Sequence, residues 1–176
     1  MSSQLTRPLA ANGTLRFATI SLLALLIPLA PRPAQAAVLD CTVSATSVAF
    51  GAYVPLQPGA LIGAGTMTAI CTVNSHRNTL TVDLSAGVSG SFTTRTMTTT
   101  VGTTTYQPNY NLYQDAANTL IWGDGTGGSQ ADSVTITRHG NNNTITTNLT
   151  VYGAVAPAQD PAPGIYTDGI TISVNF

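Results

Sequence analysis

The sequence predicts an all-β domain, built as an antiparallel β-sandwich. Threonine, valine, isoleucine and tyrosine, which favour strands, are abundant, whereas lysine and glutamate are absent. No segment of any length shows the 3.6-residue periodicity of an amphipathic helix. Short segments instead alternate between apolar and polar residues and are separated by turns rich in Gly, Pro and Asn. About seven or eight such strands are typical of a sandwich.

The N-terminal segment, residues 1–36, has the pattern of an export signal. Arg7 and Arg16 supply positive charge, the apolar run 17–27 follows, and 34–36 (AQA) fits a small-residue cleavage site. A membrane anchor is the alternative, but a spanning helix needs about 20 apolar residues and this run is about half as long. We therefore expect a cleaved signal peptide, residues 1–36, and one exported domain, residues 37–176.

The expected domain carries little charge. Residues 37–176 contain three Arg, seven Asp and no Lys or Glu. Nucleic acids require clustered Lys and Arg for phosphate contacts, and anionic membranes attract basic segments. The composition therefore argues against nucleic-acid partners, and we expect no membrane insertion after signal cleavage.

Two cysteines, Cys41 and Cys71, are the only ones in the chain. One pair in an exported protein most simply forms a disulfide. The bridge would close a loop of about thirty residues, which the chain-entropy model values at ~3.5 kcal/mol. Neither cysteine has His or Cys neighbours at zinc-ligand spacing, so a metal site is not expected.

The first expected strand spans residues 41–50 and ends at Gly51. Residues 51–65 are expected to be loop because Pro and Gly recur there. Alternation resumes in 66–73, where every second residue is apolar. Residues 79–85 alternate Leu and Val with Thr, Asp and Ser, which gives a clear strand.

The middle of the chain is less regular. Residues 86–105 are rich in Gly, Ser and Thr, and periodicity does not decide between strand and loop. Residues 106–113 are strand-like, although Pro108 belongs at an edge or bulge. The short apolar piece 120–122 follows and ends at a Gly-rich turn.

A hairpin and a final strand complete the domain. Residues 133–138 and 145–151 alternate, and the Gly- and Asn-rich segment 139–143 has the chemistry of a hairpin turn. A proline-rich connection, 157–163, leads to the last strand. In that strand one face carries Ile170, Ile172, Val174 and Phe176. Because nothing follows Phe176, we expect an apolar edge strand, which is a template for another strand.

Catalytic chemistry is not indicated. The histidines, His76 and His139, both fall in expected polar turns, and without Glu or Lys few general acids or bases remain. No constellation of residues satisfies the requirements of an active site. We therefore expect no enzyme, no catalytic residues and no cofactor; a hydrolase that uses the two histidines is the least favoured hypothesis.

A secreted binding module is a second hypothesis. An aromatic platform for glycans would use Trp122 together with tyrosines. The candidate tyrosines are Tyr106, Tyr110, Tyr113, Tyr152 and Tyr166. Tyrosines in the core and rim of a sandwich are the preferred interpretation, because no periodic exposed patch can be derived.

Several landmarks occur together and in order along the chain. They are 41–43 (CTV), 50–53 (FGAY), Cys71, 110–115 (YNLYQD), 122–125 (WGDG), 151–153 (VYG), 164–168 (GIYTD) and 174–176 (VNF). In this combination the chain resembles the spore coat protein U domain family, which includes subunits of archaic chaperone–usher pili. The resemblance runs from residue 41 to 176.

The resemblance implies an immunoglobulin-like sandwich that lacks its last strand. A periplasmic chaperone lends a strand to the open groove, and at the outer-membrane usher a neighbouring subunit's strand replaces it. Carried onto this sequence, the groove edges are the first and last strands. They comprise Val43, Ala45, Val48 and Phe50, and Ile170, Ile172, Val174 and Phe176. The pattern does not decide which face of the first strand lines the groove.

The chain departs from the family before its first cysteine. Polymerising subunits carry a donor segment there, whereas only residues 37–40 would precede Cys41 after signal cleavage. At ~3.3 Å per residue this segment is too short to fill a groove. We therefore expect a subunit that accepts a strand without donating one. The sequence thus predicts a structural subunit of a surface pilus or coat, located in the periplasm in transit and then at the cell surface.

Overall fold

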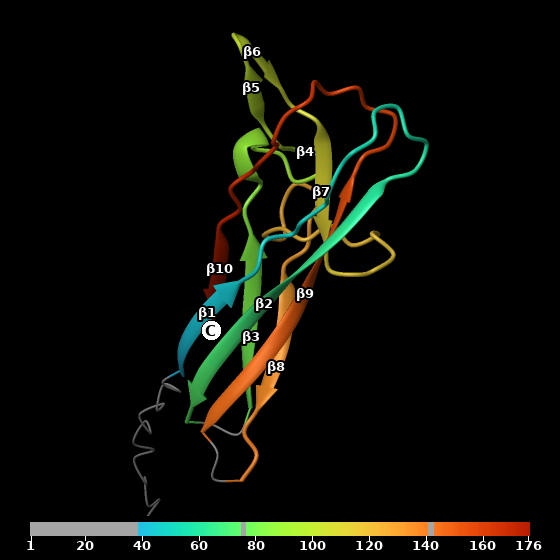
Figure 1. The fold of residues 1–176 in the computed structure, drawn as a ribbon. Helices are drawn as coiled ribbons and strands as arrows, with labels where there is room; N and C mark the ends of the chain where they lie inside the picture. The colour runs from blue at the N-terminus through green and yellow to red at the C-terminus, as the bar shows by residue number, and fades with distance from the viewer. Residues whose placement is uncertain (1–38, 75–76, 141–142) are drawn as a thin grey trace, which may run out of the picture. The chain divides into compact units, whose positions relative to one another are not determined.

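Strands make up nearly all the regular structure in the computed structural model (Figure 1). The structure describes residues 39–74, 77–140 and 143–176. The elements are β1 (Leu39–Ala45), β2 (Leu61–Val73), β3 (Arg77–Leu84), the short 3-10 helix η1 (Gly87–Ser89), β4 (Arg95–Thr96), β5 (Thr99–Val101), β6 (Thr104–Tyr106), β7 (Asn109–Tyr113), β8 (Asp132–Thr137), β9 (Thr144–Val155) and β10 (Ile172–Asn175). The predicted all-β fold is confirmed. The predicted signal peptide lies outside the described residues and stays a prediction.

Within the described ranges, no helix has the length and apolar character needed to cross a membrane.

The larger layer is a five-stranded antiparallel sheet in the order β1-β2-β9-β7-β4. A long pairing joins β2 and β9 within this sheet, and it runs from Leu61 opposite Val155 to Thr72 opposite Thr144. Along β2, buried residues alternate with exposed threonines and other small or apolar residues. This alternation places one face of the sheet on the core and the other in water.

The second layer is a three-stranded antiparallel sheet in the order β10-β3-β8. Side chains of both sheets meet in one core cluster, where Met67 and Val151 of the larger sheet pack with Val82 and Leu84 of β3. Trp122 is 1% exposed in this cluster, and its indole N–H donates to the Val82 carbonyl at 2.9 Å. The predicted antiparallel sandwich is therefore confirmed.

Among the first two predicted strands, two boundaries were wrong, and one structural feature explains both. The first strand ends at Ala45 instead of residue 50, and β2 begins at Leu61 instead of residue 66. After Ala45 the chain leaves the sheet edge and lies over the inner face of β2 and β9. Gly63 and Gly65 were predicted to lie in a loop, but they are residues of β2. The backbone of residues 46–49 approaches β2 closely at these two glycines.

The close approach is visible at three glycines that face inward. A Cβ on Gly153 would lie 2.7 Å from the Phe50 ring and 2.8 Å from Val48. A Cβ on Gly63, its partner across the β2–β9 ladder, would lie 2.8 Å from the Ala49 carbonyl oxygen, and Gly65 is similarly crowded. The glycines therefore leave a hollow in the sheet that Val48 and Phe50 fill.

The predicted disulfide between Cys41 and Cys71 is confirmed. The two residues are direct register partners in the β1–β2 pair, and their Cα atoms are 4.1 Å apart. Cys71 is 1% exposed and belongs to a second core cluster with Ala69, Val73 and Leu80. The bridge therefore ties the edge strand β1 to the core.

Replacing Cys41 by serine is expected to lower the free energy of unfolding by about 3 kcal/mol, because the unfolded chain gains the freedom that the crosslink removes. Chemical denaturation of the oxidised wild-type chain and the variant measures the difference. Reduction of the wild-type chain should reproduce the loss. Two free thiols in the exported protein, seen by mass spectrometry, would contradict the prediction.

Candidate functional site

A groove runs between two segments that are far apart in the sequence. Residues 45–50 form its N-terminal wall, and residues 166–172 form its C-terminal wall. Core side chains form its floor, namely Leu84, Tyr110, Leu112 and Val151. This cavity, the strand groove, has a volume of about 410 Å³. The core of the sandwich is therefore open to the outside along this side.

The N-terminal wall lacks the backbone pairing of a strand. The Thr46 N–H donates to the Thr66 carbonyl at 2.9 Å, but within the described chain residues 47–53 take part in no backbone–backbone hydrogen bond. Val48 and Phe50 from this stretch nevertheless pack against the core. Backbone groups near a core normally have partners, because an unpaired buried group costs about 1–3 kcal/mol. This wall is therefore suited to pair with a further strand.

β1 is incompletely covered on its inner face. Residues directly opposite each other in an antiparallel pair lie on the same face. Val43 lies opposite Ala69, which is 1% exposed, yet Val43 itself is 39% exposed. The structure thus settles the face of the first strand: Cys41, Val43 and Ala45 share the core side within β1. On the core-facing side of β1, Val43 is therefore left partly exposed among the described residues.

β10 ends the smaller sheet. It pairs with β3, and within the described part of the chain no strand pairs with its other edge. Ile170, Ile172 and Val174 are half-buried against the core, whereas Phe176 is 64% exposed. The open edge of β10 and the unpaired N-terminal wall therefore belong to the same side of the sandwich, where β1 and β10 lie (Figure 1).

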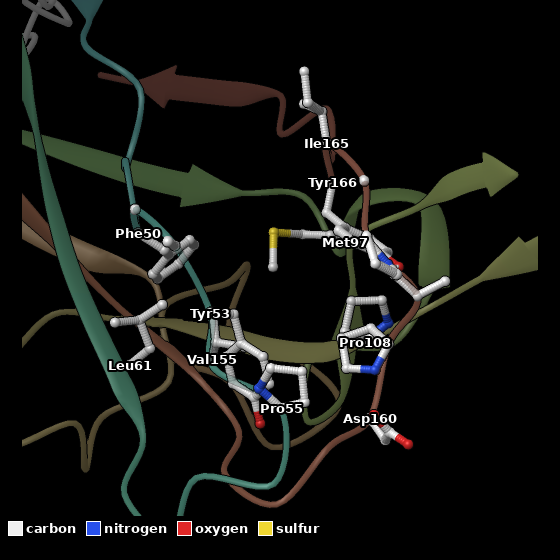
Figure 2. Close-up of a pocket in the computed structure, with 16 residues that line it drawn as sticks. Phe50, Tyr53, Pro55, Leu61, Met97, Pro108, Val155, Asp160, Ile165 and Tyr166 are labelled. Atoms are coloured by element: carbon white, nitrogen blue, oxygen red, sulfur yellow. Dashed lines mark hydrogen bonds between the residues drawn. The ribbon is translucent and has the colours of Figure 1, made fainter.

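A second cavity adjoins the strand groove, and Figure 2 shows the residues that line this second cavity. Phe50, Met97 and Tyr166 line both cavities, so the two are neighbours. This end pocket has a volume of about 730 Å³ and lies between residues from 50–55 and residues 160–166. In Figure 2 the Met97 sulfur reaches into the space between these sides, whereas Ile165 points away from it.

Asp168 fixes the C-terminal wall to the rest of the domain. Its carboxylate accepts hydrogen bonds from the Tyr110 hydroxyl at 2.7 Å and from the Val88 N–H at 3.0 Å. Gly87, with φ +69°, lies directly against this carboxylate and has no room for a Cβ. Burial, followed by the hydrogen bond and the charge of Asp168, raises the pKa of Tyr110 far above its usual range. Tyr110 therefore remains a donor that holds the wall in place.

Stability is expected to fall at alkaline pH through Tyr110. The unfolded chain loses this proton near the ordinary pKa of about 10, whereas the folded chain keeps it. The unfolded state then binds fewer protons, so the free energy of unfolding decreases above about pH 10, by at most about 1.4 kcal/mol per pH unit. Urea titrations between about pH 9 and 11 should show a steeper decrease for wild type than for Tyr110→Phe. Equal slopes would contradict this role of Tyr110.

A buried arginine joins the elements beneath the groove. Arg95 is 0% exposed and stacks 5.5 Å from the Phe92 ring. Its guanidinium donates to Asn111 Oδ1 at 2.7 Å, to the Trp122 carbonyl at 2.7 Å and to the Ser85 carbonyl at 2.9 Å. Burial lowers the pKa of Arg95, and the nearby Tyr110 and Asp168 oppose this effect. The hydrogen-bond acceptors described for Arg95 are thus all uncharged.

The comparisons with known proteins bear on this arrangement. The model of the Spore Coat Protein U domain family matches residues 32–173. The chain belongs to this family. The resemblance seen in the landmarks is therefore confirmed over most of the chain.

A solved structure shares the fold of this Spore Coat Protein U domain. It is the crystal structure of the CsuC–CsuE chaperone–tip adhesion subunit pre-assembly complex from archaic chaperone–usher Csu pili of Acinetobacter baumannii. The TM-score is 0.50 and the sequence identity 21%, and the match covers 79% of this chain and 40% of that chain. No curated protein sequence matches this chain. At this identity the structural likeness concerns the fold alone.

The structure brings together part of the predicted groove-edge set. Five of the predicted residues line the strand groove, namely Ala45, Val48, Phe50, Ile170 and Ile172. Val43, Val174 and Phe176 line neither cavity.

Sequence reasoning missed other lining residues, among them Met97, Tyr110 and Asp168. Tyr110 and Asp168 stand in two of the landmarks, but alternation gave no sign that they bond to each other. Met97 lies in the stretch whose periodicity did not distinguish strand from loop.

The structure also bears on the aromatic platform, the two histidines and a metal site. An aromatic platform around Trp122 is wrong, because that side chain is buried, as is Tyr110. His139 is exposed, and His76 lies outside the described residues. Over the described ranges there is no group of three or more His, Cys, Asp or Glu side chains that could hold a metal ion.

Proposed function

We propose that this chain is an exported, non-enzymatic structural subunit of a surface pilus or coat, assembled by strand addition. A periplasmic chaperone first lends a strand to the groove, and at an outer-membrane usher a strand of a neighbouring subunit replaces it. The observation that carries the proposal is the N-terminal wall, where residues 47–50 lie beside an apolar groove with their backbone unpaired.

The groove suits a strand better than a compact ligand. β10 offers one free strand edge, and the N-terminal wall offers unpaired backbone. A strand placed between them makes main-chain hydrogen bonds, while every second side chain covers the apolar floor. Alternation then fixes its register, because a shift by one residue would turn its apolar side chains outward. A compact ligand would leave the wall's N–H and C=O groups without partners.

Family membership and the structural likeness support the class of partner. The similar structure holds a tip adhesion subunit with a chaperone before assembly into archaic pili. We infer partners of the same kind for this chain: a chaperone, an usher and neighbouring subunits. The predicted signal peptide would direct the chain to the periplasm, from which assembly carries it to the cell surface.

Thermal denaturation of the purified chain tests the proposal. A synthetic peptide of about nine residues that alternates valine and threonine is expected to raise the melting temperature, as is the cognate chaperone. The matched control is the same peptide with N-methyl groups on alternate residues. It keeps the side chains but cannot complete a ladder, so it should not stabilise the chain.

Two outcomes would contradict strand addition. A lone chain that is already a stable monomer, and whose melting temperature no strand donor raises, has no vacant strand position. Equal stabilisation by the N-methylated peptide would show that the groove binds side chains without main-chain pairing.

A further inference from the structure

The end pocket limits how far a strand can pair. Pro55 lies on one side of it, Pro161 and Pro163 lie on the other, and the buried Pro108 also lines it. Proline has no N–H to donate, and within sheets it is confined to edges and bulges. A partner strand that pairs along the strand groove therefore finds no N–H donor for its carbonyl groups where it reaches these prolines. The ladder is expected to end at the mouth of the end pocket.

The interior of the end pocket is apolar, and the hydroxyl groups of its tyrosines are already bonded. The Tyr53 hydroxyl donates to the Ala156 carbonyl at 3.1 Å and accepts the Gln159 N–H at 2.9 Å. The Tyr166 hydroxyl donates to the Ala162 carbonyl at 2.6 Å. Of the lining residues described, only Asp160 is charged, and its exposed side chain lies at the rim (Figure 2). The pocket thus offers rings and methyl groups to an occupant.

The sides of the end pocket are fixed before anything binds. The Leu56 N–H donates to the Gln159 carbonyl at 2.8 Å, and the Ala158 N–H donates to the Gln57 carbonyl at 2.8 Å. Gln159 Oε1 accepts the Asn109 N–H at 2.6 Å, and Gln159 Nε2 donates to the Asn109 carbonyl at 3.0 Å. Leu56 and Ala158 hold positive φ angles of 58° and 55° within these contacts. Such angles cost non-glycine residues about 1 kcal/mol or more and persist only where the surroundings impose them.

We propose that the end pocket binds one large apolar side chain, aromatic by preference, which the partner segment carries just beyond its paired strand. This inference rests on the proposed function and adds a second recognition element to it. The rings of Phe50, Tyr53 and Tyr166 suit edge and offset contacts with an aromatic occupant. Met97, with its flexible thioether, adapts to the shape of that occupant. Because the pocket is preformed and adjoins the strand groove, the anchor costs little additional ordering.

Peptide affinities test the anchor. The alternating valine–threonine peptide is compared with versions that carry tryptophan beyond one end or the other, each chain being refolded with peptide present. Tryptophan at one end is expected to tighten binding by about ten- to a hundredfold, as burial of a large apolar side chain predicts. Lysine at the same position should give no gain. The end that works also reveals the direction in which the peptide lies.

Two variants test whether the gain in peptide affinity arises in the end pocket. Ala52→Trp introduces a bulky ring at an exposed position that lines the end pocket, so the tryptophan-extended peptide should bind this variant no more tightly than the parent peptide does. The matched control is Ala64→Trp, an exposed position of β2 outside the lining of either cavity, which should keep the gain.

The outcomes separate this inference from the proposed function. If the parent peptide binds but neither extension gains affinity, or the gain survives in Ala52→Trp, the anchor is overturned and strand addition stands. If no peptide binds the refolded chain, strand addition fails and the anchor fails with it.

Discussion

Replacing Ile172 by aspartate is expected to weaken binding of the alternating apolar peptide at least a hundredfold. Ile172 lines the strand groove and pairs with Leu84 in the β10–β3 ladder. In the empty groove the new carboxylate is still hydrated, but a bound strand would bury it without a partner, at a cost of about 3 kcal/mol or more. Binding should therefore suffer more than folding. Isothermal titration calorimetry of the folded variant measures the loss.

The matched control for Ile172→Asp is Thr171→Asp. Thr171 is the neighbouring residue, is exposed and lines neither cavity. It introduces the same charge on the other face of the segment, so peptide affinity should change by less than about threefold. Near-ultraviolet circular dichroism of the buried Trp122 confirms that both variants are folded. Undiminished peptide binding by folded Ile172→Asp would rule out β10 as the docking edge.

Replacing Arg95 by alanine is expected to lower the free energy of unfolding by about 3–5 kcal/mol. The substitution leaves a cavity and removes the donor to Asn111 Oδ1 and to the carbonyls of Ser85 and Trp122. Each of these acceptors lies in or beside the core, where an unpaired oxygen is costly. Urea denaturation measures the loss in the oxidised chain.

Arg138→Ala is the control for Arg95. Arg138 is partly exposed, and its guanidinium donates to Asn143 Oδ1 at 3.2 Å in a solvent-exposed hydrogen bond. Its loss should cost about 1 kcal/mol or less. Arg95→Lys should fall between wild type and Arg95→Ala, because one ammonium group cannot reach three separate acceptors with the geometry of a guanidinium. Similar stabilities for Arg95→Ala and Arg138→Ala would contradict the role given to the buried network.

Alternation in the sequence was sufficient for the strands that pack evenly on the core. β3 and β8 were predicted within two residues of their ends, because their apolar residues all face the same layer. The same rule placed Cys41 and Cys71 in strands that pair. Alternation was insufficient for residues 46–65. Gly63 and Gly65 are residues typical of turns, but in the structure they are strand residues whose missing side chains leave room for the segment that carries Val48 and Phe50. The predicted inability to donate a strand concerns residues 37–40, of which the structure describes only Leu39 and Asp40, both in β1, and it stays a prediction.

The sequence by itself determined the fold class, the disulfide and the apolar face of the last strand, because each depends on local period, composition or residue count. Only the tertiary structure decided which of the predicted edge residues line the groove, that Asp168 accepts a hydrogen bond from Tyr110, and that Arg95 is buried. These features depend on contacts between residues ten to more than a hundred positions apart. Such contacts follow from how two sheets pack, and local periodicity carries no information about them.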